Sequence, residues 1–189
     1  MTFENFTALE IKFTQTCLIN EGVPKLGNNS VKVNSIFFAL DGKTKNGEEF
    51  VASAISKGAR VVVAKKFCSE ICGEELAKDV TSIKTANPFL FLVECLKIFY
   101  APLPANIYAV TGTNGKTSTV EFIRQILQIL GNKSASIGTL GVVCEAVAKE
   151  DLVPFDLTTP DIVSLYKNLF VLCKNGVNDV AIEVSSIGL

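Results

Sequence analysis

The 189-residue sequence has no histidine, which removes the commonest general base and any Ser-His catalytic arrangement. Without histidine, a zinc site would have to be built from cysteines and carboxylates alone. Six cysteines are present, but only Cys68 and Cys72 lie close together in the sequence. We therefore expect reduced, buried thiols and no structural metal site formed by cysteines.

The sequence also lacks a long apolar run, a secretory signal and an excess of basic charge. No apolar segment reaches the ~18 residues that would cross a membrane. The N-terminus, MTFENFTALEIKF, has neither a basic start nor an unbroken apolar stretch, so we expect a cytoplasmic protein without a membrane partner. The formal net charge of −1 excludes a broad basic surface for nucleic acid.

The composition predicts a packed core, since 48% of the residues are hydrophobic and only 20% are charged. Strand and helix patterns alternate along the sequence. In the first half, short β-branched runs and one-sided apolar periodicity predict strands at 35–40 and 60–66, and helices at 48–57 and 87–100. Two prolines in APLPAN (101–106) end the last of these helices and give a stiff connection. We place a domain boundary here, near residue 104.

The second half repeats the alternation. The patterns predict strands at 106–110 and 177–185, a strand running into a glycine turn at 134–142, and helices at 116–130 and 160–175, the last with proline in its first turn. Strands separated by helices indicate parallel βαβ units. We therefore predict an α/β protein, in which a small α/β domain (1–104) precedes an incomplete P-loop domain with a mostly parallel sheet (105–189). The strand at 177–185 should be interior, with a neighbour on each edge.

The segment VTGTNGKT (110–117) follows a predicted strand and opens a predicted helix. It is shorter than the common P-loop pattern, but its glycines let backbone N–H groups point inward, towards the positive end of the helix. Lys116 could reach the outer phosphates of a nucleotide, and the Thr117 hydroxyl could ligate Mg²⁺. The alternative is an ordinary glycine turn with an exposed lysine.

Glu183 interrupts an otherwise apolar strand in VAIEVSS. A buried carboxylate is costly unless it is paired or holds a metal, and ligands of open α/β sheets bind at the carboxyl ends of strands. Glu183 is therefore a candidate Mg²⁺ ligand that works with Thr117. An ion pair with a nearby lysine, or a solvated strand end, remains open as the alternative.

The segment LTTPDI places two threonines, Thr158 and Thr159, directly before a proline and a predicted helix. The spacing favours simple N-capping of this helix by Thr159. The alternative is that the hydroxyls and the helix N-terminus hold a carboxylate or phosphate of a second substrate.

Four motifs, VTGTNGKTSTVEF, IGTLGV, LTTPDIVSLY and AIEVSSIGL, occur in an order that resembles the Mur ligases, most closely the UDP-N-acetylmuramoyl-tripeptide synthetase type. The first half agrees, because IFFALDGKTKNGEEFVASAISKGARVVVA resembles the N-terminal domain of that family, which holds a uridine nucleotide. The resemblance implies an ATP-dependent acid–amino-acid ligase. ATP would phosphorylate the terminal carboxylate of UDP-N-acetylmuramoyl-L-alanyl-D-glutamate, and the amine of a third amino acid would attack the acyl phosphate.

The resemblance also implies roles for individual residues, of which Lys116 and Glu183 would be catalytic. The residues that hold the ATP phosphates would be Gly112, Thr113, Asn114, Gly115, Lys116, Thr117 and Ser118. Thr117 and Glu183 would hold Mg²⁺. The residues that contact the UDP-linked muramoyl substrate would be Asn28, Asn29, Ser30, Thr158, Thr159 and Ser185.

Three departures from the family pattern bear on these roles. The region LGNNSVKV lacks the arginine that usually precedes the first-domain strand, and Ile187 stands where the family usually has histidine. The sequence ends at Leu189, whereas the family continues with a carbamylated lysine, an adenine pocket and an amino-acid-binding domain. We therefore expect this polypeptide alone not to complete ligation. A second chain would supply the rest, or the chain would be a truncated, non-catalytic nucleotide-binding module.

Overall fold

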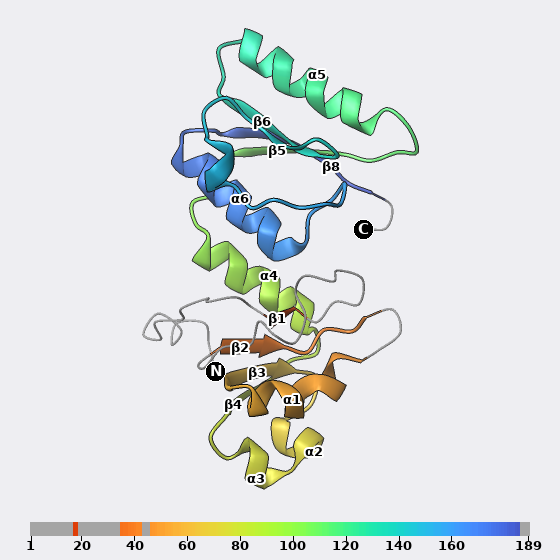
Figure 1. The fold of residues 1–189 in the computed structure, drawn as a ribbon, viewed down its shortest axis with the longest axis vertical. Coiled ribbons are helices and arrows are strands. Elements are labelled where there is room, and N and C mark those ends of the chain that lie inside the picture. The colour runs from red at the N-terminus through yellow and green to blue at the C-terminus, as the bar shows by residue number, and fades with distance from the viewer. Residues whose placement is uncertain (1–16, 19–34, 43–45, 186–189) are drawn as a thin grey trace. The chain divides into compact units, whose positions relative to one another are not determined.

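The computed structural model describes residues 17–18, 35–42 and 46–185 (Figure 1). Asn28, Asn29, Ser30 and Ile187 lie outside the described residues. The chain divides into two compact units, Met1–Leu92 and Val93–Leu189, which are described separately below. The domain boundary near residue 104 stays a proposal. In the described part of the chain, no helix combines the length and apolarity needed to cross a membrane.

The first unit holds a four-stranded parallel sheet. Its strands, in spatial order, are β1 (Cys17–Leu18), β2 (Ser35–Phe38), β3 (Ala59–Ala64) and β4 (Thr81–Lys84). Its helical segments are η3 (Gly47–Phe50), α1 (Val51–Ser56), α2 (Cys68–Cys72) and α3 (Glu74–Ala77). The strands and the helix predicted between 35 and 66 are confirmed, with the first helical turn in 3₁₀ form. The sequence patterns missed β4 and the two short helices.

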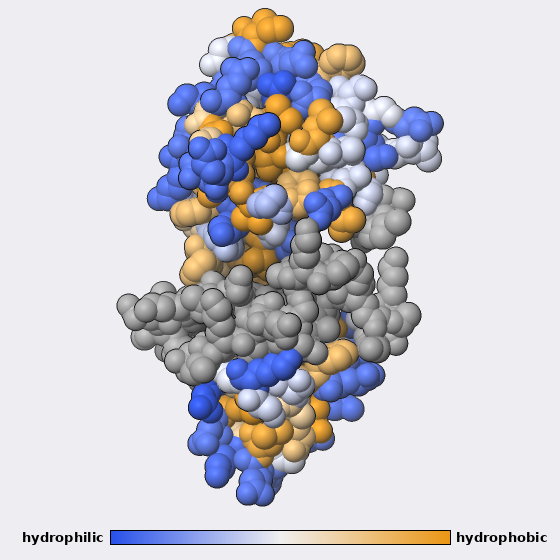
Figure 2. All heavy atoms as spheres, in the orientation of Figure 1, coloured by the Kyte–Doolittle hydropathy of each residue, from blue (hydrophilic) through white to orange (hydrophobic). Residues whose placement is uncertain are grey.

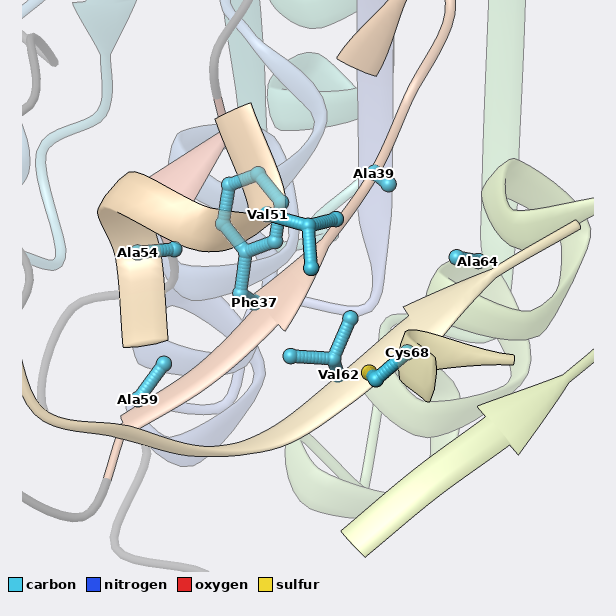
Figure 3. Close-up of a cluster of buried hydrophobic side chains, with 8 residues drawn as sticks. All are labelled: Phe37, Ala39, Val51, Ala54, Ala59, Val62, Ala64 and Cys68. Atoms are coloured by element: carbon cyan, nitrogen blue, oxygen red, sulfur yellow. The ribbon is translucent and has the colours of Figure 1, made fainter. Parts of the chain in front are cut away.

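The core of the first unit lies between the sheet and its helices. Figure 3 shows Phe37 of β2 and Val62 of β3 facing Val51 of α1, with Cys68 of α2 beside them. All four side chains are fully buried. The buried Cys68 is unpaired and fills space as an apolar residue.

The second unit holds the phosphate-loop segment. The division between the units falls within α4 (Pro88–Phe99). The elements that follow are β5 (Asn106–Val110), α5 (Lys116–Ile129), β6 (Ser134–Gly138), β7 (Gly141–Val143), η4 (Lys149–Asp151), α6 (Ile162–Lys174) and β8 (Asp179–Glu183). The sheet order is β5-β8-β6-β7, in which only β7 is antiparallel. The α/β class with mostly parallel sheets is confirmed, and so is the interior position of β8.

Two sequence predictions in this unit were incomplete or wrong in detail. The strand predicted to run into a glycine turn at 134–142 is present as β6 with its turn, but the prediction missed β7, because Thr139 and Leu140 turn the chain back into this antiparallel strand. The last helix begins at Ile162, and its N-cap is Asp161 instead of Thr159. The Asp161 carboxylate accepts hydrogen bonds of 3.0 Å from the backbone N–H groups of residues 163 and 164.

The two faces of the second sheet carry opposite chemistry, and α5 and α6 cover opposite faces (Figure 1). The face towards α6 is aliphatic, with Ala135, Ile137, Val180 and Ile182 packed against Leu169, Leu172 and Val177. The face towards α5 carries the alternate residues of the same strands, Ser134, Ser136, Gly138, Asp179, Ala181 and Glu183. This α5 face leads directly to the phosphate-loop segment.

The outer surface of α5 is also partly apolar. Figure 2 shows apolar atoms at the top of the view, over one end of this helix. The helix exposes Phe122, Ile126 and Ile129, and its C-cap Leu130 is exposed as well. These residues lie away from the buried Val120 and Arg124, so α5 is held to the sheet by one narrow face.

Candidate active site

The loop between β5 and α5 is shaped by two glycines. Gly112 has φ of 146° and Gly115 has φ of 78°, which are values that other residues adopt only with strain. Gly115 is the N-cap of α5, and no side chain caps this helix. In the described hydrogen bonds, no side chain accepts from the first N–H groups of α5, and the loop residues 111–115 that precede the helix are exposed. An uncapped helix N-terminus of this kind favours binding of an anion.

Lys116 lies over this loop. Its ammonium group donates hydrogen bonds to the carbonyl oxygens of Gly112 at 2.7 Å and Thr113 at 3.4 Å. The loop therefore fixes the positive charge beside the uncapped N–H groups. The neighbouring Asn114 and Ser118 are exposed around it. Of the sequence-predicted phosphate residues, 112–115 and Ser118 are exposed, whereas Lys116 and Thr117 are half-buried beside them.

Glu183 lies beside this loop at the end of β8, with only 1% of its surface exposed. The strand register explains its position, because Glu183 is paired directly with Val110, the last residue of β5. The Thr117 hydroxyl donates to Glu183 Oε2 at 3.0 Å. Thr139 donates its backbone N–H to Oε1 at 3.0 Å and its hydroxyl to Oε2 at 3.2 Å.

These contacts bear on the alternatives left open for Glu183. Its burial excludes a solvated strand end. Within the described residues its side-chain partners are neutral donors, and none of the ion pairs includes it. An ionised carboxylate that is buried among neutral partners is costly unless a cation completes the site.

The donor set fits Mg²⁺, which is commonly held in proteins by one or two side-chain oxygens together with phosphates and water. The Thr117 hydroxyl gives its proton to Glu183, so its oxygen lone pairs remain free to ligate a cation. Oε1 of Glu183 accepts one described hydrogen bond, and a second acceptor position remains. In the described part of the chain, no group of three histidine, cysteine or acidic side chains could hold a metal by itself.

The predicted substrate residues Thr158, Thr159 and Ser185 lie next to Glu183. The Thr159 hydroxyl donates to the Glu183 carbonyl oxygen at 3.2 Å and accepts from the Ser185 N–H at 3.0 Å. The hydroxyl of Thr158 lies 3.3 Å from that of Thr139. Hydrogen bonds therefore connect these hydroxyls to Thr139 and Glu183, next to the phosphate-loop segment. The N-terminus of α6 is already capped by Asp161, so it is not an open anion site.

Sequence analysis missed two residues of the site, Gly138 and Thr139. Both belong to the motif IGTLGV, and both lie next to Glu183 because β6 pairs with β8. A Cβ added to Gly138 would lie 2.2 Å from Glu183 Oε1, so the two residues are in close contact. A polar residue directly after a parallel strand was the available signal, because such residues gather at the carboxyl edge of the sheet.

Asn168 of α6, also missed, holds the segment that leads to the two threonines. Its side chain is fully buried. Its amide oxygen accepts from the Val153 N–H at 2.8 Å, and its amide nitrogen donates to the Val153 carbonyl oxygen at 3.1 Å. These two hydrogen bonds satisfy the backbone N–H and carbonyl groups of Val153, which lies in a loop without a neighbouring strand.

A mostly parallel sheet, in which a strand leads through a glycine loop into an uncapped helix, defines a domain of the P-loop type. Residues 110–189 match the family model of the Mur ligase middle domain. This part of the chain belongs to the Mur ligase family, and the resemblance seen in the four sequence motifs is confirmed.

The similar proteins agree with this assignment. The chain is 38% identical over 172 residues to UDP-N-acetylmuramoyl-L-alanyl-D-glutamate–2,6-diaminopimelate ligase of Rickettsia bellii (strain RML369-C), a match that covers 88% of this chain and 33% of the relative. The protein of the same name from Zymomonas mobilis subsp. mobilis (strain ATCC 31821 / ZM4 / CP4) is 38% identical over 154 residues, covering 82% and 29%. The chain thus spans about a third of the length of these relatives.

A solved structure of a ligase with that name shares the fold. It superposes with a TM-score of 0.59 and 22% sequence identity, covering 100% of this chain and 36% of the other. The α/β architecture of the chain is therefore that of a Mur ligase.

Proposed function

We propose that this chain carries the nucleotide-binding part of an ATP-dependent ligase of peptidoglycan precursor synthesis. The ligase joins a third amino acid to UDP-N-acetylmuramoyl-L-alanyl-D-glutamate through an acyl phosphate. The names of the relatives support 2,6-diaminopimelate as the incoming amine. The membership of residues 110–189 in the Mur ligase family supports the reaction class.

One observation carries the proposal. The Thr117 hydroxyl and the buried Glu183 carboxylate are hydrogen-bonded at 3.0 Å beside the uncapped N-terminus of α5. Residues 112–118 hold the ATP phosphates with loop N–H groups, and the Lys116 ammonium balances their charge. Thr117 and Glu183 hold Mg²⁺, which when bound neutralises charge that develops during phosphoryl transfer.

The acceptor end of the site is assigned to the hydroxyl cluster of Thr158, Thr159 and Ser185. These hydroxyls orient the muramoyl peptide, whose terminal carboxylate is the phosphate acceptor. Their contacts to Thr139 and to the backbone of Glu183 support a single site for donor and acceptor. The first domain (1–104) is proposed to hold the uridine nucleotide, with Asn28, Asn29 and Ser30 among its contacts.

Lys116→Ala tests the phosphate role. Loss of a charge-assisted contact should weaken ATP binding by ~10- to 100-fold in isothermal titration calorimetry of the full chain with Mg²⁺. The matched control is Lys97→Ala, which removes an exposed lysine paired with Glu94 and should leave ATP affinity unchanged. Equal ATP affinity in the Lys116 variant and the wild type would contradict the proposal.

A second candidate function is a module that binds nucleotide without ligating. The phosphate-loop segment and the uncapped N-terminus of α5 favour this candidate, because they can bind a nucleotide without an acceptor substrate. The two are separated by an assay with ATP, the muramoyl dipeptide and diaminopimelate, followed by mass spectrometry of the products. Tripeptide product supports the ligase, whereas ATP binding without any product supports the module.

A further inference from the structure

We propose that Thr139 is a positioning residue that fixes the orientation of the Glu183 carboxylate towards Thr117, and that Gly138 provides the space for that carboxylate. The inference rests on the proposed function, in which Glu183 and Thr117 hold the metal ion. Thr139 touches neither the phosphate loop nor α5 in the described hydrogen bonds. Its action on the metal site therefore passes through Glu183.

Thr139 contacts both oxygens of the carboxylate. The backbone N–H donates to Oε1 at 3.0 Å, and the hydroxyl donates to Oε2 at 3.2 Å. Rotation of the carboxylate about its last bond would break both hydrogen bonds together. One residue therefore fixes the plane of the carboxylate, and Oε2 is left facing the Thr117 hydroxyl.

The three described donors orient Glu183 without neutralising it. An ionised carboxylate has about four acceptor positions, and Thr117 and Thr139 occupy three of them. All three donors are neutral, so the negative charge stays available for a cation. Oxygen ligands that are oriented before the cation arrives do not have to be ordered when it binds, which raises affinity.

Gly138 is required for space and not for backbone conformation. Its φ is not among the positive values found at seven other glycines of the described residues. A Cβ at this position would lie 2.2 Å from Oε1 and 2.5 Å from both Cγ and Cδ of Glu183. Any other residue at 138 would thus displace the carboxylate from its contacts with Thr139.

Thr139 also connects the metal end of the site to the acceptor end. Its hydroxyl has one proton, and the Glu183 carboxylate is a stronger acceptor than the Thr158 hydroxyl. The proton therefore goes to Glu183, and Thr158 donates to Thr139 across 3.3 Å. Thr158, which is proposed to contact the muramoyl substrate, is thus linked through Thr139 to the Glu183 carboxylate by two successive hydrogen bonds.

The test compares Thr139→Val, which removes the hydroxyl at nearly constant volume, with Thr139→Ser, which keeps it. Mn²⁺ binding is measured by electron paramagnetic resonance of the full chain with ATP, and ATP binding is measured separately in EDTA. We expect Thr139→Val to weaken Mn²⁺ binding about 10-fold, as for other groups that orient a metal ligand. ATP affinity in EDTA should be unchanged, and Thr139→Ser should restore Mn²⁺ binding. Gly138→Ala should weaken Mn²⁺ binding at least as much as Thr139→Val.

The matched control is Thr81→Val, at an exposed residue of β4, which should leave Mn²⁺ binding unchanged. Wild-type Mn²⁺ affinity in a folded Thr139→Val variant would overturn the inference, and so would failure of Thr139→Ser to restore it. If Thr139→Val and Thr139→Ala both fail to fold while Thr139→Ser folds, the hydroxyl is a folding determinant and the inference is again overturned. Absence of ATP and Mn²⁺ binding in the wild type would instead overturn the proposed function.

Discussion

The two faces of the second sheet differ more than the two faces of a buried parallel sheet usually do. Strands covered on both sides generally have near-continuous apolar sequences. Here β6 reads SASIG and β8 reads DVAIE, so apolar residues alternate with small or polar ones although every residue of both strands is buried. The aliphatic face packs against α6, whereas the polar face supports α5 and ends at Glu183. Stability and chemistry are thus assigned to opposite sides of the same strands.

The polar face is stabilised by a network of partners. Arg124 of α5, which is 9% exposed, donates to Glu121 Oε2 at 2.8 Å and to Gln128 Oε1 at 2.8 Å. The Ser136 hydroxyl of β6 donates to Glu121, and the Ser134 hydroxyl donates to the carbonyl oxygen of Arg124 at 2.8 Å. The two serine hydrogen bonds join α5 to β6, whereas the Arg124 bonds lie within the helix and hold Glu121 in place to accept from Ser136.

The largest expected effect on stability is on the aliphatic face. Leu172 is fully buried in the cluster of α6 and the sheet. Leu172→Ala removes its packing and leaves a cavity, which should lower the free energy of unfolding by about 2–5 kcal/mol. Urea unfolding followed by circular dichroism measures this loss.

The matched control for this change lies on the opposite helix. Ile129 of α5 is 85% exposed, so Ile129→Ala should change the free energy of unfolding by no more than about 0.5 kcal/mol. Similar losses in the two variants would show that the aliphatic face is not the main source of stability in this unit.

Glu183→Gln on the polar face should have a smaller effect on the free energy of unfolding, and in the opposite direction. The amide oxygen can accept from the Thr139 N–H, and the amide nitrogen then faces two hydroxyls that can turn to accept from it. Because an uncompensated buried charge is removed, the free energy of unfolding should stay the same or rise by about 1 kcal/mol. Mn²⁺ binding in the presence of ATP should be lost.

The control for Glu183→Gln is Glu150→Gln, at an exposed position of η4, which should alter neither stability nor Mn²⁺ binding. A large loss of stability in Glu183→Gln would mean that the ionised carboxylate is itself a stabilising group. That result would remove the contrast between the two faces, since both would then serve the fold.

The phosphate-loop segment, Thr117 and Glu183 could be predicted from the sequence because each has a local signal. The strand ending at Val110, the glycines and the helix beginning at Lys116 stand in one segment, and the predicted bounds of the strand and of the helix start match the structure. Glu183 was identifiable because a carboxylate inside an apolar strand is costly, and its contact with Thr117 is observed.

The parts that could not be predicted depend on contacts between distant segments. Thr159 and Asp161 are both good N-caps, and the choice is made by Thr159 bonding instead to Ser185 and Glu183. Thr139 lies in an apolar stretch whose turn has no proline or Asn-Gly signal. Its role depends on β6 pairing with β8, which is more than 40 residues away in the sequence. The short β4 and α2 have too few residues to show a period.

The smallest expected effect is a pH dependence that distinguishes the polar face from the aliphatic one. Burial acts to raise the pKa of Glu121, but hydrogen bonds from Arg124 and Ser136 and the charge of Arg124 together hold this pKa below its ordinary value of 4.5. A carboxyl whose pKa is lower in the folded state stabilises the fold above its unfolded pKa. This contribution is lost as the pH falls from 4.5 through the lower, folded value. The free energy of unfolding of the wild type should therefore decrease over that acid range.

In Glu121→Gln this part of the decrease should be absent, whereas Leu172→Ala should lower stability equally at pH 6 and pH 4 because no charge is involved. Urea unfolding of the three proteins at several pH values measures the slopes. Equal slopes in the wild type and Glu121→Gln would show that the Glu121–Arg124 pair does not stabilise α5 on the sheet, and the polar face would then serve the active site alone.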